Sequence, residues 1–170
     1  QDHIRPGLAR HLDGFDPGRD ALPVESLVAV DRWALARTAD LQREILAAYA
    51  AYEFHRVYQQ LHNFCIVDLG AFYLDVIKDR LYTARKDGRP RRSAQTVLWT
   101  VAHDLCTLLA PVLSFTASEA WGHLPGRPAE SVFLAGLPRR ARPADMMLLA
   151  DDSSLFGDQH MYGPEGINFF

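Results

Sequence analysis

The stretch that most constrains the fold runs over residues 54–85, with the sequence FHRVYQQLHNFCIVDLGAFYLDVIKDRLYTAR. Its apolar residues recur at steps of three and four, the spacing of a helix that packs one face on a core. Asp68 and Gly70 interrupt this spacing. Either one long helix bends at Gly70, or two helices meet there with Asp68 as the N-cap of the second, and we favour two helices. The stretch therefore predicts the central helical hairpin of a bundle, with these core-facing residues: Phe54, Val57, Tyr58, Leu61, Phe64, Cys65, Leu69, Phe72, Val76, Ile77 and Leu81.

The flanking sequence predicts further helices around the same core. One begins near residues 24–26, with a first turn that can be separate, and extends to about Tyr49. Another begins at Ser93, a good N-cap, and ends or kinks at Pro111. The predicted fold is therefore all-α: an antiparallel bundle of four to five helices with an irregular C-terminal tail.

Three segments follow from the composition along the chain. Residues 1–23 are rich in Pro and Gly and predict a linker or lead-in, and residues 24–138 form the helical domain. Within it, the capping-box pattern of residues 116–119 predicts a short helix, whereas residues 131–134 are extended at most. Residues 139–170 form an acidic tail of uncertain structure, in which one turn of helix or strand is conceivable at residues 146–150.

Charge is distributed unevenly along the chain. The formal net charge is −3, but residues 143–170 contain five acidic residues and no Lys or Arg, which leaves residues 1–142 at +2. The connection at residues 82–92 is the most basic one, and residues 80–92 contain six cations against Asp87 alone. Cations neutralise phosphates and an exposed aromatic ring such as that of Tyr82 can stack on an unpaired base, so this connection indicates nucleic-acid binding. The alternative is a solvated interhelical loop.

Candidate catalytic and metal-binding groups are sparse. His55, His62 and Cys65 lack the usual metal-ligand spacing, and we interpret them as polar residues beside an apolar stripe. Cys106, close to His103, is predicted to be a small core hydrophobe rather than a nucleophile. The carboxylates of Asp75 and Asp79 are one turn apart and flanked by cations, which favours a solvated charged face. The sequence contains no phosphate-binding glycine loop and no hydrolase or metalloprotease motif, so we expect neither a metal site nor a self-sufficient enzyme.

Several segments in succession resemble one known family. They are DRW (31–33), FHRVYQQLHNFC (54–65), VDLGAFYLDVIKDRLYT (67–83), RRSAQTVLW (91–99), LAPVLSFTASEAW (109–121), HLPG (123–126) and ESVFLAGLP (130–138). This series resembles the anticodon-binding helical domain of bacterial-type isoleucyl-tRNA synthetase, over residues 15–138. The segment at 67–83 points to the isoleucine enzyme rather than to its valine and leucine relatives.

The resemblance implies a helical domain that binds the anticodon stem-loop of isoleucine tRNA in the cytoplasm. Cations would position phosphates while unpaired bases are stacked and read. Trp33 can equally serve as a core anchor. The residues that we expect to contact RNA are Arg32, Trp33, Lys78, Arg80, Tyr82, Arg85, Lys86, Arg89, Arg91 and Arg92.

The chain departs from the whole enzyme of that family in two ways. The family's ATP-binding signatures and its editing domain are absent from the sequence, so the ATP and magnesium of the parent enzyme are not expected to bind here and the chain alone should be inactive. The acidic residues 143–170 match no part of the family that we recognise. The start at Gln1 suggests a fragment, while the oligomeric state is left open. No run approaches the roughly 18 apolar residues of a membrane span. The alternative function is a helical protein-interaction module that no longer binds RNA.

Overall fold

The computed structural model describes residues 11–138, and every regular element in this part of the chain is helical. In chain order these elements are α2 (Pro17–Asp20), η1 (Val24–Ser26), α3 (Ala29–Ala50), α4 (Phe54–Asn63), η2 (Phe64–Tyr73), α5 (Leu74–Thr83), α6 (Arg89–Leu109), α7 (Ser114–Gly122) and α8 (Val132–Ala135). The prediction of an all-α bundle is confirmed.

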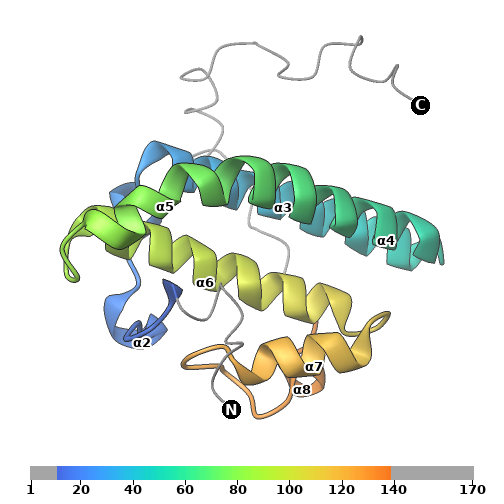
Figure 1. Cartoon of the computed structure of the whole chain (residues 1–170). Coiled ribbons are helices and arrows are strands. Elements are labelled where there is room, and N and C mark those ends of the chain that lie inside the picture. Colours follow the sequence, from blue (N-terminus) through green and yellow to red (C-terminus); the bar gives the residue numbers. More distant parts are fainter. Residues whose placement is uncertain (1–10, 139–170) are drawn as a thin grey trace, which may run out of the picture.

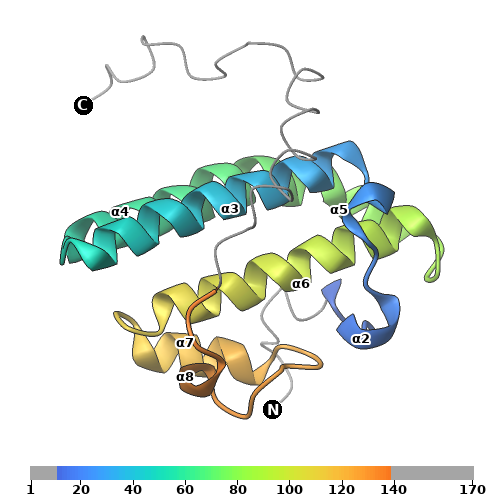
Figure 2. The ribbon, with the colours of Figure 1, turned by 180° about the vertical axis from the view of Figure 1, so that it is seen from behind.

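The helices are arranged in layers (Figures 1 and 2). Helix α3 lies beside a long rod made of α4, η2 and α5, which runs back in the opposite direction. Helix α6 packs against α3 and α5, and its other side is covered by α7 and α8. The short helix α2 packs near the start of α6. The core therefore lies along α6, between the α3–α5 layer and the smaller helices.

The rod over residues 54–83 is one continuous helical run, so the predicted break into two helices is wrong. Its middle, η2, is a π-helix, in which each turn holds more residues than in an α-helix. Buried residues along the rod are separated by three or four positions except between Phe64 and Leu69, where the step is five. Asp68 does not cap a helix: it lies within η2, and its carboxylate accepts a hydrogen bond of 2.9 Å from Arg37.

The change of period also explains which core predictions fail on this rod. The predicted core side chains Phe54, Tyr58, Cys65 and Val76 are exposed. The π-helical turn shifts the buried face by one position, so that η2 ends on the buried residue Tyr73, and the following helix α5 buries the predicted residues Ile77 and Leu81. Cys106 on α6 is buried among apolar side chains, which confirms its prediction as a core residue.

Helix α6 begins at Arg89, one turn before the predicted N-cap Ser93. Gly88 is the N-cap and Pro90 occupies the first turn, where a missing N–H group costs nothing. Ser93 is buried instead: its hydroxyl donates to Asp31 and accepts a hydrogen bond of 2.9 Å from the backbone N–H of Val28. The later basic residues of the predicted connection therefore belong to the first turn of a helix.

The predicted short helix is present as α7, but its predicted start is wrong. Helix α7 begins at Ser114 without a side-chain cap, so residues 116–119 lie inside the helix rather than at its start. Residues 131–134 are not extended, because the Ser131 hydroxyl accepts a hydrogen bond of 3.4 Å from Phe133 N–H and begins α8. The chain leaves α8 through Gly136, whose φ of 72° suits glycine.

The described part of the lead-in packs on the bundle. Leu12 and Phe15 belong to the hydrophobic core. Backbone groups of the lead-in are held by α6, since Leu22 N–H donates to Thr96 Oγ1 at 3.1 Å and Gln95 Nε2 donates to the carbonyl of His11 at 2.9 Å. Residues 11–23 are thus packed against the helical domain despite their linker-like composition. The acidic tail, including residues 146–150, lies outside the described residues.

Candidate nucleic-acid interface

The candidate interface is the end of the bundle at which α5 connects to α6, and we call residues 80–92 the basic corner. In Figure 1 this corner lies at the opposite end of the molecule from the connection between α3 and α4. Because α5 ends at Thr83 and α6 begins at Arg89, only a short connection separates the two helices. Side-chain hydrogen bonds and ion pairs fix both sides of the corner.

A buried carboxylate fixes the α5 side of the corner. Asp31, at 0% exposure on the first turn of α3, accepts hydrogen bonds from Arg80 at 2.8 and 3.0 Å and from the Tyr73 hydroxyl at 2.8 Å. The Ser93 hydroxyl also donates to it, so the carboxylate ties α3, η2, α5 and α6 together. Burial, followed by the charge of Asp31, raises the pKa of the Tyr73 hydroxyl well above its usual value. The Arg80 guanidinium therefore serves mainly to neutralise Asp31.

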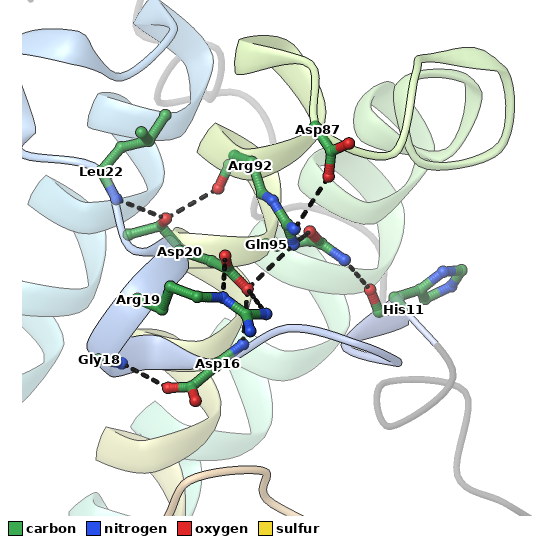
Figure 3. Close-up of polar contacts among 10 residues, drawn as sticks. His11, Asp16, Gly18, Arg19, Asp20, Leu22, Asp87, Arg92 and Gln95 are labelled. Atoms are coloured by element: carbon green, nitrogen blue, oxygen red, sulfur yellow. Dashed lines mark hydrogen bonds and ion pairs between the residues drawn. The ribbon is translucent and has the colours of Figure 1, made fainter.

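Intramolecular acceptors also hold the three arginines on the α6 side. Arg89 donates to the carbonyl of Ser26 at 2.8 Å, and Arg91 donates to the carbonyl of Leu81 at 2.7 Å. The Arg92 guanidinium is 3.0 Å from Gln95 Oε1 and forms two ion pairs of 3.4 Å, with Asp20 and Asp87 (Figure 3). Each of these contacts orients a side chain and uses part of its donor capacity.

Two cations of the corner have no such partner. Within residues 11–138, the side chains of Arg85 and Lys86 form no hydrogen bond or ion pair, and both are exposed. Tyr82 lies close by along the chain with 67% of its surface exposed, and its ring meets that of His11 edge-on at 5.5 Å between centroids. An ammonium or guanidinium without a partner is available to a phosphate, and an exposed ring is available to a base.

The other predicted site residues lie outside this set. Lys78 is exposed and paired with Asp75 on the surface, as expected for a solvated charged face. Arg32 donates to the carbonyl of Leu27 at 2.8 Å. Trp33 packs edge-on against Phe72 at 4.8 Å on the margin of the core, which fits the core anchor that the sequence also allowed. Whether any of the ten residues contacts RNA stays a prediction.

A pocket of about 370 Å³ opens between the basic corner and the lead-in, and we call it the lead-in pocket. It is lined by Asp13, Gly14, Lys86, Asp87, Arg91, Arg92 and Gln95. Figure 3 shows the contacts that shape one side of it: Arg92 lies between Asp87 and Asp20, and Gln95 reaches back to His11. Cations from the corner therefore share a pocket with a carboxylate of the lead-in, which the sequence analysis did not predict.

Exposed aromatic residues at the opposite end of the bundle were also missed. Tyr52 is 80% exposed in the turn between α3 and α4, where its φ is 57°, and Phe115 on α7 is 94% exposed. The Tyr49 hydroxyl donates to the carbonyl of Leu108 at 2.7 Å and so joins the ends of α3 and α6 near these turns. Periodicity within the helices could not identify these positions, because they depend on where each helix ends.

The remaining polar clusters are structural. The His103 ring stacks on Trp99 at 5.3 Å, and its Nδ1 lies 3.0 Å from Asp104, which accepts a further hydrogen bond from Gln42. Burial raises the pKa of the Cys106 thiol to about 11, so this cysteine stays protonated at neutral pH and is a poor nucleophile. Within residues 11–138, no three His, Cys, Asp or Glu side chains are grouped so that they could hold a metal ion. No helix in this range is both long and apolar enough to cross a membrane.

Comparison with known proteins places these features in a family. The family described as the anticodon-binding domain of tRNA ligase matches residues 31–155, which include the basic corner. The chain is 60% identical over 128 residues to isoleucine–tRNA ligase of Halorhodospira halophila, an alignment that covers 75% of this chain and 14% of the relative. It is 56% identical over 127 residues to isoleucine–tRNA ligase of Nitrosococcus oceani, with 75% of this chain and 14% of the relative covered.

A third relative gives the same result. Isoleucine–tRNA ligase of Teredinibacter turnerae is 53% identical over 125 residues, which cover 74% of this chain and 13% of the relative. The chain thus spans only about one seventh of the length of the curated relatives that it matches. The family match extends over most of the sequence, from residue 31 on the first turn of α3 to beyond the end of α8. On this evidence, the chain belongs to the family of anticodon-binding domains of tRNA ligases.

Proposed function

We propose that this chain is the anticodon-binding part of an isoleucine–tRNA ligase and that it binds the anticodon stem-loop of isoleucine tRNA. The observation that carries the proposal is the 60% identity over 128 residues to an isoleucine–tRNA ligase, in a region that the anticodon-binding family also matches. The all-helical bundle and its basic corner support it, because RNA binding needs cations at the surface and accessible rings.

The contacts at the basic corner divide its residues into two roles. Arg85 and Lys86, which have no partner within residues 11–138, would bind backbone phosphates, and the exposed ring of Tyr82 would stack on an unpaired base. Arg80 and Arg92 are largely neutralised by carboxylates and would act as positioning residues that hold the corner in place. Arg89 and Arg91 retain free donors beside their carbonyl partners and could contribute to both roles.

In this proposal, other parts of the ligase would carry out the chemistry of the parent enzyme. Aminoacylation, the use of ATP and magnesium, and editing would belong to parts of the ligase that this chain does not cover, and the chain alone would be inactive. The parent enzyme would act in the cytoplasm. Support for this division is the small share, 14%, of the relatives' length that the chain matches.

The proposal is tested by measuring the affinity of the chain for isoleucine tRNA over a series of salt concentrations. We expect affinity to fall steeply as salt rises, because each phosphate contact releases a counterion. Arg85→Ala and Lys86→Ala should each weaken binding and reduce the slope of log K against log salt by about 1. Arg43→Ala, which removes the same charge from an exposed position on α3, is the matched control. Absence of binding even at low salt would overturn the proposal and favour a protein partner.

A further inference from the structure

The lead-in pocket combines two kinds of ligand group in one place. Lys86 and Arg91 bring positive charge from the α5–α6 corner, and Asp13 brings a carboxylate from the lead-in. Asp13 is exposed, and its side chain forms no hydrogen bond or ion pair within residues 11–138. Lys86 is likewise unpartnered, so the two opposite charges line one pocket without pairing with each other. The pocket thus offers a strong donor and a strong acceptor to a single ligand.

The other lining groups are already engaged in contacts that shape the pocket. Arg92 is neutralised by Asp20 and Asp87 and also donates to Gln95 (Figure 3). Gln95 is fully buried, and both ends of its amide are used, one by Arg92 and the other by the carbonyl of His11. These contacts join α6, the lead-in and the corner, and they leave Lys86, Arg91 and Asp13 as the groups with capacity for a ligand.

A ribonucleotide matches this arrangement. Its phosphate accepts hydrogen bonds from an ammonium and a guanidinium, and the 2′-hydroxyl of its ribose donates one to a carboxylate. A volume of about 370 Å³ lies within the range of small-ligand sites. Since the 2′-hydroxyl is the group by which proteins distinguish RNA from DNA, a carboxylate beside a phosphate site favours RNA at that position.

We propose that the lead-in pocket holds one nucleotide of the bound RNA, with its phosphate on Lys86 and Arg91 and its 2′-hydroxyl on Asp13. This inference rests on the proposed tRNA binding and adds to it a contact from Asp13, a residue that the sequence analysis did not predict. It also gives the lead-in, which the sequence presents as a linker, a direct part in RNA recognition. A substitution at Asp13 should therefore change how strongly affinity depends on the 2′-hydroxyl. A substitution at Lys86 should lower affinity through the loss of a phosphate contact.

The test is a set of RNA stem-loops with the sequence of the isoleucine tRNA anticodon arm, each carrying a single 2′-deoxy nucleotide. With the unsubstituted chain, we expect one position at which the deoxy nucleotide lowers affinity by about tenfold, the effect of losing a hydrogen bond to a charged group. With Asp13→Ala, the same position should lose most of this effect, because no side-chain oxygen remains to accept the hydrogen bond of the 2′-hydroxyl. Lys86→Ala should lower affinity for every member of the set, and more than Arg43→Ala does.

The outcomes separate this inference from the proposed function. If the chain binds the unmodified stem-loop but no deoxy effect depends on Asp13, the pocket assignment is overturned while tRNA binding stands. If the chain does not bind the unmodified stem-loop at low salt, both are overturned. Circular dichroism of Asp13→Ala and Lys86→Ala should match that of the unsubstituted chain, since both side chains are exposed and without partners in the described structure.

Discussion

At the scale of single residues, Asp31 connects the helices that support the basic corner. Its fully buried carboxylate accepts hydrogen bonds from Arg80, Tyr73 and Ser93. Asp31→Asn would leave the partly buried Arg80 charge without its counterion, and we expect it to lower the free energy of unfolding by about 3 kcal/mol. Urea unfolding measures this change.

The matched control is Asp75→Asn, which removes a carboxylate paired with Lys78 on the exposed surface of α5. An exposed pair of this kind contributes at most about 1 kcal/mol. Equal effects of the two substitutions would contradict the role given to Asp31.

Cys106 gives a prediction for the pH dependence of stability. Burial raises the pKa of its thiol to about 11, whereas an unfolded cysteine ionises near pH 8.5. Between these values only the unfolded state releases the proton, so this contribution to stability is complete below about pH 8.5 and falls as pH rises toward about 11.

We therefore expect the unsubstituted chain to lose about 1–2 kcal/mol more than Cys106→Ala between pH 8 and pH 10, as measured by urea unfolding at each pH. The comparison cancels contributions from Tyr49 and Tyr73, whose pKa values are raised by burial as well. The same loss in both proteins would show that the Cys106 thiol is not shielded from solvent.

The sequence predicted where cations gather but not which of them are available. Arg80 and Lys86 look equivalent in the basic segment, yet Arg80 pairs with an aspartate 49 positions earlier in the chain and Lys86 has no partner in the described structure. Such long-range pairing is set by how α3 packs against the rod, and no local pattern contains it. Asp13 was missed for the same reason, since only the folded lead-in brings it beside Lys86.

At the scale of elements, the π-helix η2 is a structure that the spacing of apolar residues did not predict. Phe64 and Leu69, both buried, are five positions apart in the sequence. Asp68 and Gly70, on either side of Leu69, suggested instead that the helix ends there. A π-helical turn accommodates the extra residue without ending the helix. The long helices α3 and α6 were therefore predicted, whereas the junction at residues 64–73 and the short helices α2 and α8 were not.

Gly70 tests the geometry of η2. A Cβ atom at this position would lie 3.1 Å from the backbone oxygen of Cys65, a contact that requires the backbone to move. Replacement of glycine by alanine in an ordinary helix stabilises it by about 1 kcal/mol, and we expect Gly70→Ala to gain nothing because crowding offsets this preference. Thermal and urea unfolding measure the difference.

Gly122, at the end of α7, is the control because a Cβ atom there meets no other atom within 4 Å. Gly122→Ala should raise the free energy of unfolding by about 0.5 kcal/mol. A similar gain from Gly70→Ala would contradict the close approach in η2.

At the scale of the whole molecule, the helical bundle followed from the sequence because apolar periodicity identifies helices that must share a core. The sequence did not predict how much of the chain packs against this bundle. Residues 11–23 have the Pro and Gly content of a linker, yet Leu12 and Phe15 join the core and hydrogen bonds to α6 hold the backbone at His11 and Leu22. Composition averages over such a segment and hides the few side chains that determine its position.

The measurement that most directly tests the account is the affinity of the chain for the isoleucine tRNA anticodon stem-loop, compared with the same stem carrying a different anticodon. If the chain is an anticodon-binding domain specific for isoleucine tRNA, the native hairpin should bind at least about tenfold more tightly, since each lost base contact costs about 1–3 kcal/mol. Both hairpins should show the same steep dependence on salt, because their phosphates are the same. Equal affinity for the two hairpins, or no binding to either at low salt, would contradict the account.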